Sequence, residues 1–209
     1  MTAWLTQITP DFRNPAAHLD LRDAVRMHQR VMSLVPNGLG DEPRRRAGVL
    51  YRIEQVPGAM RVLVQTGLKP DLAKLPENYG SAQARDLGPL LQWLREGAVV
   101  RYRLTANTCL RKSRSKTVVP LRGADAERWW IERAPSCGLG LESLISQSPG
   151  DVVGGSRQKD SIRHALTQFD GVAMVTGTDA LTSAIVTGIG RGKSHGCGLL
   201  SIAPVIGAT

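Results

Sequence analysis

Residues 48–67 read GVLYRIEQVPGAMRVLVQTG, and this stretch determines how the first half of the chain is interpreted. Gly48–Val56 and Met60–Gly67 are rich in β-branched and apolar residues, as strands are. The Pro57-Gly58 pair between them is typical of a tight turn. The stretch therefore predicts two antiparallel strands joined as a hairpin.

The residues before the hairpin predict a strand followed by a helix. Ala3–Thr9 alternates between apolar and polar side chains. In Leu21–Val35 the apolar residues recur with the period of a helix, and Pro36-Asn37-Gly38 ends the pattern. With the hairpin this gives the order β-α-β-β, and Leu68–Leu94 has room for a short helix and a fourth strand.

The second half of the chain repeats this order of elements. A strand at Ala98–Ala106 is expected to pair with Val118–Leu121 across a basic loop. Turn residues at Pro149-Gly150-Asp151 and Gly154-Gly155 separate two of the later strands. The remaining expected elements are a helix at Ala124–Arg133, strands at Leu141–Ser148 and Ser161–Val175, a helix at Asp179–Val186 and a strand at Leu199–Val205.

Two successive β-α-β-β-α-β patterns predict an α+β protein made of two tandem ferredoxin-like (RRM-like, βαββαβ) domains. The division is expected near Gly97, with an N-terminal domain at residues 1–96 and a C-terminal domain at residues 97–209. The two halves share no visible sequence similarity, so the predicted repeat is one of architecture.

Composition limits the class of protein. The chain has 209 residues, of which 42% are hydrophobic, so a folded core is expected. It has no apolar run long enough to cross a membrane, and its N-terminus has no signal-peptide pattern. The three cysteines are far apart and odd in number, which fits neither a disulfide framework nor a zinc site. We expect a cytoplasmic protein without a metal or nucleotide cofactor.

The net charge of +9 indicates a polyanionic partner. Between Arg101 and Arg122 the sequence has seven basic residues and no acidic one. A solvated surface normally mixes both signs, so this block favours contact with phosphates. An exposed basic loop without a partner is the alternative interpretation.

The glycine-rich run GIGRGKSHGCG at residues 188–198 contains GKS, the end of a P-loop motif. A P-loop also needs a glycine five residues before Gly192, but Thr187 stands there. The context is reversed as well, because a helix is expected before the run and a strand after it, whereas a P-loop precedes its helix. The run therefore predicts no nucleotide site. Alternate glycines instead allow a close approach of the backbone to an anion, with Lys193 adding positive charge.

The run and its continuation, GIGRGKSHGCGLLSIAP, closely resemble the C-terminal glycine-rich signature of the RAMP superfamily. More narrowly, the chain resembles the CasE family, type I-E CRISPR repeat endoribonucleases that are subunits of the Cascade complex. AWLTQIT, LRDAVRMHQRVMSLVPN, VRYRLTANT and VVPL follow in the family's order and spacing, so the resemblance spans essentially the whole chain.

The resemblance implies an enzyme that cleaves the repeat hairpin of precursor CRISPR RNA without a metal ion. In that reaction the 2′-hydroxyl attacks the neighbouring phosphate and leaves a 2′,3′-cyclic phosphate. The implied partners are the repeat hairpin RNA, before and after cleavage, and the other Cascade subunits. The chemistry needs a group that takes a proton, a group that assists the leaving oxygen, and positive charge around the phosphate.

The resemblance places the catalytic histidine at His28. Periodicity alone would put His28 in one helical stripe with Leu21, Val25 and Met32, and would make it a core residue. The family often has a tyrosine one turn before this histidine, where Val25 stands here. We expect His28 to be the main catalyst.

Other residues compete for, or assist, the catalytic role. Lys193 is the preferred electrophilic group, and His195 in the same loop is the rival histidine. His18 and His164 have the patterns of a surface residue and an ordinary strand residue. Arg157 and Lys159 resemble a segment that the family uses near the scissile phosphate, although a solvated turn explains them equally well.

RNA binding is expected from two basic segments and from the glycine run. In the family, a hairpin of the C-terminal half enters the major groove of the RNA stem, and the matching region here is residues 107–117. The low aromatic content of 4% also favours a duplex over single-stranded RNA. The candidate RNA-binding residues are Arg44, Arg45, Arg46, Arg111, Lys112, Arg114, Lys116, Arg157, Lys159, Gly188, Gly190, Gly192, Gly196 and Gly198.

Two other functions remain open at this point. A catalytically silent RAMP-type RNA-binding subunit would keep the fold and the glycine run but use His28 only in its core, and Val25 favours this alternative. A general ferredoxin-like RNA-binding protein, such as a ribosomal or translation factor, would share the fold but not the whole-chain resemblance.

Overall fold

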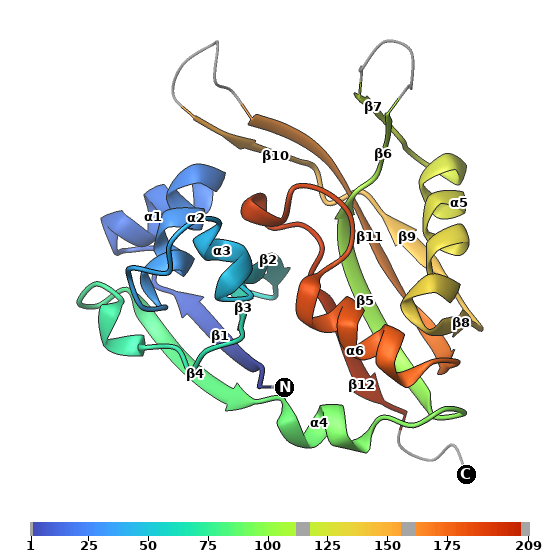
Figure 1. The fold of residues 1–209 in the computed structure, drawn as a ribbon. Coiled ribbons are helices and arrows are strands. Elements are labelled where there is room, and N and C mark those ends of the chain that lie inside the picture. Colours follow the sequence, from blue (N-terminus) through green and yellow to red (C-terminus); the bar gives the residue numbers. More distant parts are fainter. Residues whose placement is uncertain (1, 112–117, 156–161, 206–209) are drawn as a thin grey trace.

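The computed structural model describes residues 2–111, 118–155 and 162–205. Its first half is built on an antiparallel four-stranded sheet with the spatial order β2-β3-β1-β4 (Figure 1). This is the order expected for a ferredoxin-like unit. The hairpin predicted in residues 48–67 forms its strands β2 and β3. The strands are β1 (Trp4–Pro10), β2 (Leu50–Val56), β3 (Ala59–Thr66) and β4 (Gly80–Asp86).

The helical segment after β1 consists of two helices, α1 (Pro15–Arg22) and α2 (Ala24–Ser33), where the sequence predicts a single one. Asp23 separates them because its backbone is extended and its carboxylate accepts the N–H groups of Val25 and Arg26. The cap rotates α2 so that Ala24, Met27 and Val31 face the core.

The first half has no second long helix among its described residues. A short 3-10 turn, η1 (Leu72–Lys74), connects β3 to β4, and helix α4 (Gly88–Trp93) follows β4. The predicted division at residues 96 and 97 falls in the connection from α4 to the next strand and stays a prediction.

The second half forms a larger antiparallel sheet with the order β10-β11-β5-β12. Helices α5 (Ala124–Arg133) and α6 (Thr178–Thr187) pack on this sheet, and Trp129, Trp130 and Leu181 join Phe169 in the core. The strands are β5 (Val99–Asn107), β8 (Leu139–Leu141), β9 (Ile145–Gln147), β10 (Asp151–Gly154), β11 (Ile162–Val175) and β12 (Leu200–Pro204). The expected class of two tandem ferredoxin-like units is confirmed.

Two strand predictions in the second half were wrong in detail, and one strand was missed. Val118–Leu121 does not pair with the long strand β5, because β7 (Val118–Pro120) pairs with β6 (Cys109–Arg111) in a separate ribbon. The expected strand at Leu141–Ser148 is divided into β8 and β9, both of which pair with β11. The turn-rich stretch that follows contains β10, which reaches over α2 in Figure 1.

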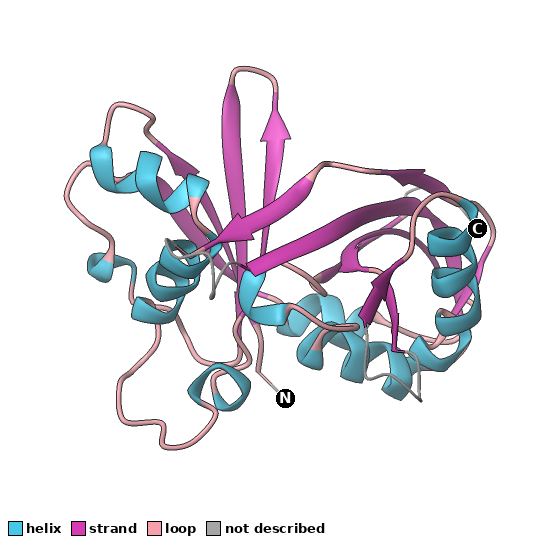
Figure 2. Ribbon diagram, turned by 90° about the horizontal axis from the view of Figure 1, so that it is seen from above, coloured by secondary structure: helices cyan, strands magenta, loops and turns pink. Residues whose placement is uncertain are grey.

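The two sheets are joined by a buried arginine. Arg52 in β2 is 2% exposed, and its guanidinium donates to the carbonyl of Leu199 at 3.0 Å and to Ser201 Oγ at 3.0 Å in the other half. Its charge is balanced by Glu54, whose carboxylate lies 2.8 Å from Arg52 Nη2 and also accepts from Arg103 of β5 at 3.2 Å. Gln65 adds a second link by donating to the Ile185 carbonyl at 2.8 Å. Figure 2 shows the strands of the two halves meeting in this region.

We predict that Arg52→Met destabilises the protein by about 3 kcal/mol, because it leaves the buried Glu54 carboxylate without its nearest counter-charge. Urea unfolding monitored by tryptophan fluorescence measures the change. Arg61→Met is the matched control, since Arg61 is more exposed and lies 3.6 Å from the same carboxylate; we expect less than about 1 kcal/mol. Equal losses in the two variants would contradict a special role for Arg52.

Candidate active site

The candidate site lies where α2 of the first half meets the glycine run of the second half. The run follows α6 and leads to β12, and its centre forms a 3-10 turn, η3 (Lys193–His195). A helix thus precedes the GKS sequence and a strand follows it, as the exclusion of a P-loop requires. The Tyr51 hydroxyl joins the halves here, at 3.3 Å from the Ala24 carbonyl and 3.4 Å from the Ser194 carbonyl.

All five glycines predicted to bind RNA have positive φ angles and pack against the protein itself. A Cβ on Gly198 would lie 2.5 Å from the Ile189 carbonyl oxygen, and a Cβ on Gly188 would lie 2.7 Å from the Leu50 side chain. A Cβ on Gly196 would lie 3.2 Å from the Tyr51 ring. The shape of the loop therefore requires these glycines. The sequence alone suggests only that they bring the backbone close to an anion.

His28 lies beside the core-facing residues of α2, not among them. Met27 and Val31 are buried in the core, whereas His28 is only partly buried. The periodicity-based expectation of a core histidine is therefore wrong, because α2 starts only after its cap at Asp23 and its core-facing stripe (Ala24, Met27 and Val31) is one position away from His28. The His28 ring is 6.4 Å from the His195 ring, centroid to centroid. Its Nδ1 has no hydrogen-bond partner among the described residues.

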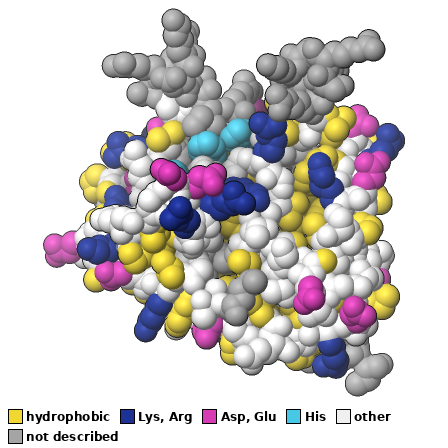
Figure 3. Space-filling model, in the orientation of Figure 1, with side chains coloured by type: hydrophobic (Ala, Val, Ile, Leu, Met, Phe, Trp, Pro, Cys, Tyr) yellow, Lys and Arg dark blue, Asp and Glu magenta, His cyan; other side chains and the backbone are white. Residues whose placement is uncertain are grey.

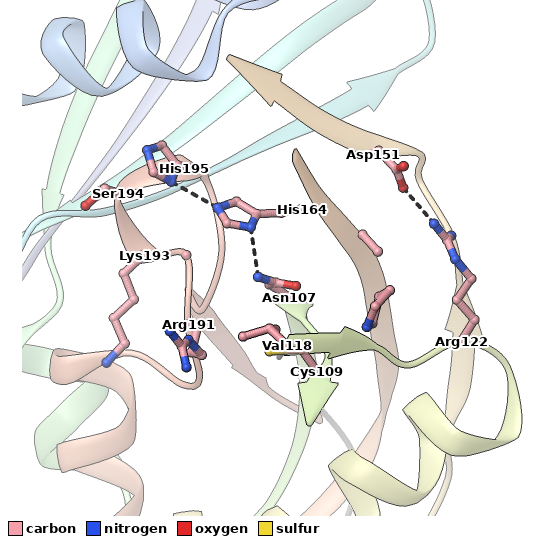
Figure 4. Close-up of a pocket in the computed structure, with 13 residues that line it drawn as sticks. Asn107, Cys109, Val118, Arg122, Asp151, His164, Arg191, Lys193, Ser194 and His195 are labelled. Atoms are coloured by element: carbon pink, nitrogen blue, oxygen red, sulfur yellow. Dashed lines mark hydrogen bonds and ion pairs between the residues drawn. The ribbon is translucent and has the colours of Figure 1, made fainter. Parts of the chain in front are cut away.

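His195 belongs to a chain of three hydrogen-bonded side chains. The Asn107 amide nitrogen lies 2.9 Å from His164 Nδ1, and His164 Nε2 lies 3.1 Å from His195 Nδ1 (Figure 4). Asn107 ends β5 and His164 lies in β11, so two neighbouring strands hold the loop histidine. His164 lies in a strand, as expected, and its side chain additionally links Asn107 to His195.

The charges around these histidines are positive. Burial and nearby Arg44 lower the pKa of His28, and burial and Arg191 lower that of His164. The pKa of His195 is lowered by burial and then by His164 and His28. The three imidazoles are consequently more often neutral at pH 7 than free histidines would be. Figure 3 shows histidine side chains at the surface beside lysine and arginine side chains.

Lys193 lies at the edge of this site. Its Nζ donates to the Thr187 carbonyl at 2.8 Å, and Figure 4 shows its side chain extending away from His195. Burial, followed by the charges of Arg44 and Arg45, lowers the pKa of Lys193. The loop thus brings Lys193 close to the arginines of helix α3 (Pro43–Arg46) but does not direct its ammonium group at the histidines.

The predicted arginines of α3 have different surroundings. Arg44 donates to the Val49 carbonyl at 3.0 Å, so its guanidinium is held near the site. Arg45 forms an exposed ion pair with Glu42 at 3.2 Å, and Arg46 lies against Gly40. Arg44 is therefore the member of this group that contributes most to the charge at His28.

The basic block at residues 101–122 is less uniform than its sequence suggests. Arg103 pairs with Asp170 and Glu54, and Arg122 pairs with Asp151 at 3.0 Å, so partners from distant strands balance both charges. The backbone of Arg111 ends β6. Lys112, Arg114 and Lys116 lie outside the described residues, as do Arg157 and Lys159.

The segment before Arg157 contacts helix α2 directly. A Cβ on Gly154 would lie 3.1 Å from the Ala24 Cβ, and the Gly155 N–H donates to Asp23 Oδ1 at 3.4 Å. The end of β10 is therefore packed on the first turn of α2, the helix that carries His28. The sequence interpreted Gly154-Gly155 only as a turn.

Sequence reasoning did not single out three residues of this site and set a fourth, His164, aside as an ordinary strand residue; the three are Asn107, Arg191 and Tyr51. An isolated backbone bridge pairs Arg191 with Asn107, and Tyr51 is fully buried. Burial raises the pKa of the Tyr51 hydroxyl, which keeps its proton and acts as a link between the halves. Only the alternation of β11 hinted at His164, and none of the four has a motif.

Neither a metal cluster nor a membrane span is found in the part of the chain that the structure describes. Residues 2–111, 118–155 and 162–205 contain no group of three His, Cys, Asp or Glu side chains that could hold a metal ion. Within the same ranges, no helix has the length and apolarity needed to cross a bilayer.

Comparison with known proteins gives consistent matches along the whole chain. A family model described as CRISPR associated protein matches residues 3–204. The CRISPR-associated endoribonuclease Cse3 of Thermus thermophilus is 30% identical over 216 residues, covering 96% of this chain and 100% of the relative. The CRISPR system Cascade subunit CasE of Escherichia coli is 27% identical over 199 residues, covering 88% of this chain and 94% of the relative.

Solved structures give the same result. A structure of Thermus thermophilus Cse3 bound to an RNA representing a pre-cleavage complex matches with a TM-score of 0.85 and 28% identity, covering 98% of this chain and 100% of that one. A chain of a CRISPR RNA-guided surveillance complex in a pre-nicking state matches with a TM-score of 0.68 and 37% identity, covering 97% and 100%.

We predict that Gly198→Ala destabilises the protein by clearly more than Gly58→Ala. Both glycines have positive φ, so each variant has the cost of about 1–2 kcal/mol for an L-residue in that region. Only Gly198 would also place its Cβ against a carbonyl oxygen, since nothing lies within 4 Å at Gly58. Thermal unfolding measures both variants. Equal losses of stability in the two variants would mean that the glycine run accommodates a Cβ at position 198 without further cost.

We also predict that acidification below about pH 6.5 destabilises the protein partly through the histidine cluster. The pKa values of His164 and His195 are lowered on folding, so the unfolded chain binds more protons in this range and stability falls as pH falls. Melting temperatures at pH 7.5 and 5.5 test this. Between these two pH values, the melting temperature of the double variant His164→Gln/His195→Gln should fall by less than that of the wild type. The melting temperature of His18→Gln, on α1 outside the cluster, should fall by as much as that of the wild type.

Proposed function

The chain belongs to the CRISPR-associated protein family that includes Cse3 and CasE, and from this premise we propose that it is an endoribonuclease of CRISPR RNA processing. It cleaves the repeat hairpin of precursor CRISPR RNA. It then stays bound to the mature RNA as a subunit of the Cascade complex, as the match to a chain of a surveillance complex suggests.

The observation that supports this proposal best is the meeting of His28 with the η3 turn. A histidine of the first half faces a histidine of the second, and Arg44, Lys193 and Arg191 add positive charge around them. An RNA phosphodiester is a singly charged anion that fits such surroundings. General acid–base chemistry on its neighbouring 2′-hydroxyl needs groups of this kind at this separation.

We propose that the reaction proceeds without a metal ion. Neutral His28 accepts the proton of the 2′-hydroxyl, because its lowered pKa keeps a lone pair available at pH 7. The 2′-oxygen bonds to phosphorus and the bond to the 5′-oxygen breaks, which leaves a 2′,3′-cyclic phosphate and a 5′-hydroxyl. Arg44, which lies near His28, stabilises the additional negative charge on the phosphate oxygens in the transition state, and Lys193 adds positive charge from the edge of the site.

The RNA stem is proposed to extend from this site over the second half. Arg111 ends β6, Lys112, Arg114 and Lys116 follow it in the sequence before β7, and Arg157 and Lys159 follow β10 in the sequence. Arg45 and Arg46 belong to α3 of the first half, and the glycine run contributes its backbone from the second half. We propose a cytoplasmic location, since the substrate is a transcript and the three cysteines are free thiols.

A catalytically silent RNA-binding subunit is the second candidate, and the position of Val25 supports it. Val25 stands where the family often has a tyrosine, and the Tyr51 hydroxyl is already committed to the carbonyls of Ala24 and Ser194. If a tyrosine is indispensable for proton transfer, this chain binds RNA and does not cleave it.

We predict that the wild-type protein cleaves a synthetic hairpin RNA with a CRISPR repeat sequence in the presence of EDTA. His28→Ala should slow cleavage by about 100-fold or more while RNA binding is retained, because it removes the group that accepts the proton. Single-turnover rates from denaturing gels and binding constants from filter retention measure the two effects.

Two controls separate the candidates. A substrate with a 2′-deoxy sugar at the cut should bind without being cleaved, and the normal product should carry a cyclic phosphate detectable by mass spectrometry. Binding without cleavage by the wild type would favour the silent subunit, and loss of cleavage in EDTA would refute the metal-independent mechanism. Full activity of His28→Ala would refute the role of His28.

A further inference from the structure

We propose that His195 is the second catalytic histidine of the site and gives its Nε2 proton to the leaving 5′-oxygen, with Asn107 and His164 holding its ring in position. This inference rests on the proposed function, because it names the group that completes the same cleavage. It also gives a role to the three-residue chain, which the proposed function so far leaves unused.

The hydrogen bonds determine which nitrogen of His195 can act. The Asn107 amide nitrogen can only donate, so His164 Nδ1 accepts and neutral His164 carries its proton on Nε2. His164 Nε2 therefore donates to His195 Nδ1. His195 in turn carries its own proton on Nε2, the nitrogen that points away from His164 in Figure 4. The chain thus directs an N–H donor out of the strand pair.

The position of His195 fits a group that acts opposite His28. The ring centroids are 6.4 Å apart and the rings are inclined by 62°, so one phosphate group can reach the outer nitrogens of both imidazoles. His195 lines both clefts next to the site, one with Arg191 and Lys193 and the other with the β2 and β11 side chains. A phosphodiester placed between the rings would have its 2′-oxygen near one imidazole and its 5′-oxygen near the other.

The charges of the site allow His195 to be protonated when RNA is bound. The titratable rings nearest to it are His28 of α2 and His164 of β11, and Arg191 and Lys193 of its own loop line the same cleft, with the Lys193 ammonium directed away. The carboxylates that line the two clefts are paired with arginines, so the free protein disfavours a further positive charge at His195; they are Asp20, Glu54, Asp151 and Asp170. A bound phosphate supplies the missing negative charge and stabilises the imidazolium form of His195.

Asn107 suits both protonation states of this chain. When His195 is an imidazolium, its Nδ1–H donates to His164 Nε2, and the proton of His164 moves to Nδ1. The Asn107 amide can then turn its oxygen to accept from that nitrogen, because an amide has both a donor and an acceptor. The ring of His195 keeps one orientation while its charge changes.

The cleavage step is balanced with these two histidines. The 2′-oxygen gives its proton to His28 and bonds to phosphorus, and the electron pair of the breaking P–O bond remains on the 5′-oxygen. That oxygen takes the Nε2 proton of His195, which becomes neutral. Exchange with solvent then removes the extra proton from His28 and restores the one on His195.

A substrate with sulfur in place of the 5′-bridging oxygen tests the assignment, because a thiolate leaves without being protonated. On the normal hairpin RNA, His195→Phe should be about 100-fold or more slower than wild type, since it keeps a ring but has no proton to give. On the sulfur-containing RNA, His195→Phe should come within about tenfold of the wild type. His28→Ala should remain slow on both substrates, and His18→Ala should match the wild type on both.

The other outcomes overturn the proposal. If His195→Phe is slow on both RNAs, the role of His195 is structural. If the sulfur-containing RNA restores the rate of His28→Ala, His28 is the proton donor and the two histidines have exchanged roles. His195→Phe as fast as a cleaving wild type would remove His195 from the reaction and leave the proposed function intact. A wild type that cleaves neither RNA would instead refute the proposed function.

The positioning role of His164 has its own test on the same pair of substrates. His164→Ala should lower the rate on the normal RNA by about 10–100-fold. His164→Gln should lose less, because its amide can still hydrogen-bond to His195 Nδ1, through its nitrogen when His195 is neutral and through its oxygen when His195 is an imidazolium. Both defects should nearly vanish on the sulfur-containing RNA, which a merely structural defect would not do. A loss that persists on both RNAs would overturn the positioning role.

Discussion

The site exists because a buried guanidinium holds two separate sheets together. Arg52 is almost fully buried, and its donors reach the backbone and a hydroxyl of the other half, while Glu54 balances its charge. A buried ion pair is weak as a source of stability but strict in its geometry, because a shifted partner leaves a charge unpaired. The next residue toward the N-terminus, Tyr51, holds α2 and η3 against each other. One strand thus fixes both the relative position of the halves and the contact between α2 and η3 at the proposed site.

The electrostatics of the site follow from which charges are paired and which are left over. Arg52, Arg103 and Arg122 have carboxylate partners and contribute to the structure. Arg44 and Arg191 lie close to the histidines and lower their pKa values. Because the imidazoles stay neutral, they add no repulsion to the positive charges of the empty site. Those positive charges attract a phosphodiester. The net charge of +9 therefore overstates the number of cations that face a ligand, because some of them hold the protein together.

Much of the fold could be predicted from local patterns. The hairpin at β2 and β3, helix α5 and strand β12 were predicted almost to their bounds, because alternation, helical period and turn residues are local properties. The division of the first helix at Asp23 was missed because its cap is one extended residue inside an apparently continuous period. The resemblance selected His28 where periodicity alone misplaced it. His164 and Asn107 could not be found, since they become neighbours of His195 only when β5 and β11 pair.

The glycine run shows how one sequence feature can have a structural and a chemical role together. Its glycines look suited to bringing a bare backbone up to a ligand, but each one faces protein atoms that a Cβ would contact. Because the loop must turn through positive φ angles in so few residues, it has little conformational freedom. A loop held this tightly can place the His195 ring in line with His164, which a flexible connection could not. The glycines then serve to fix the position of the side chains between them, and the proposed proton transfers depend on such positioning more than on the strength of any single group.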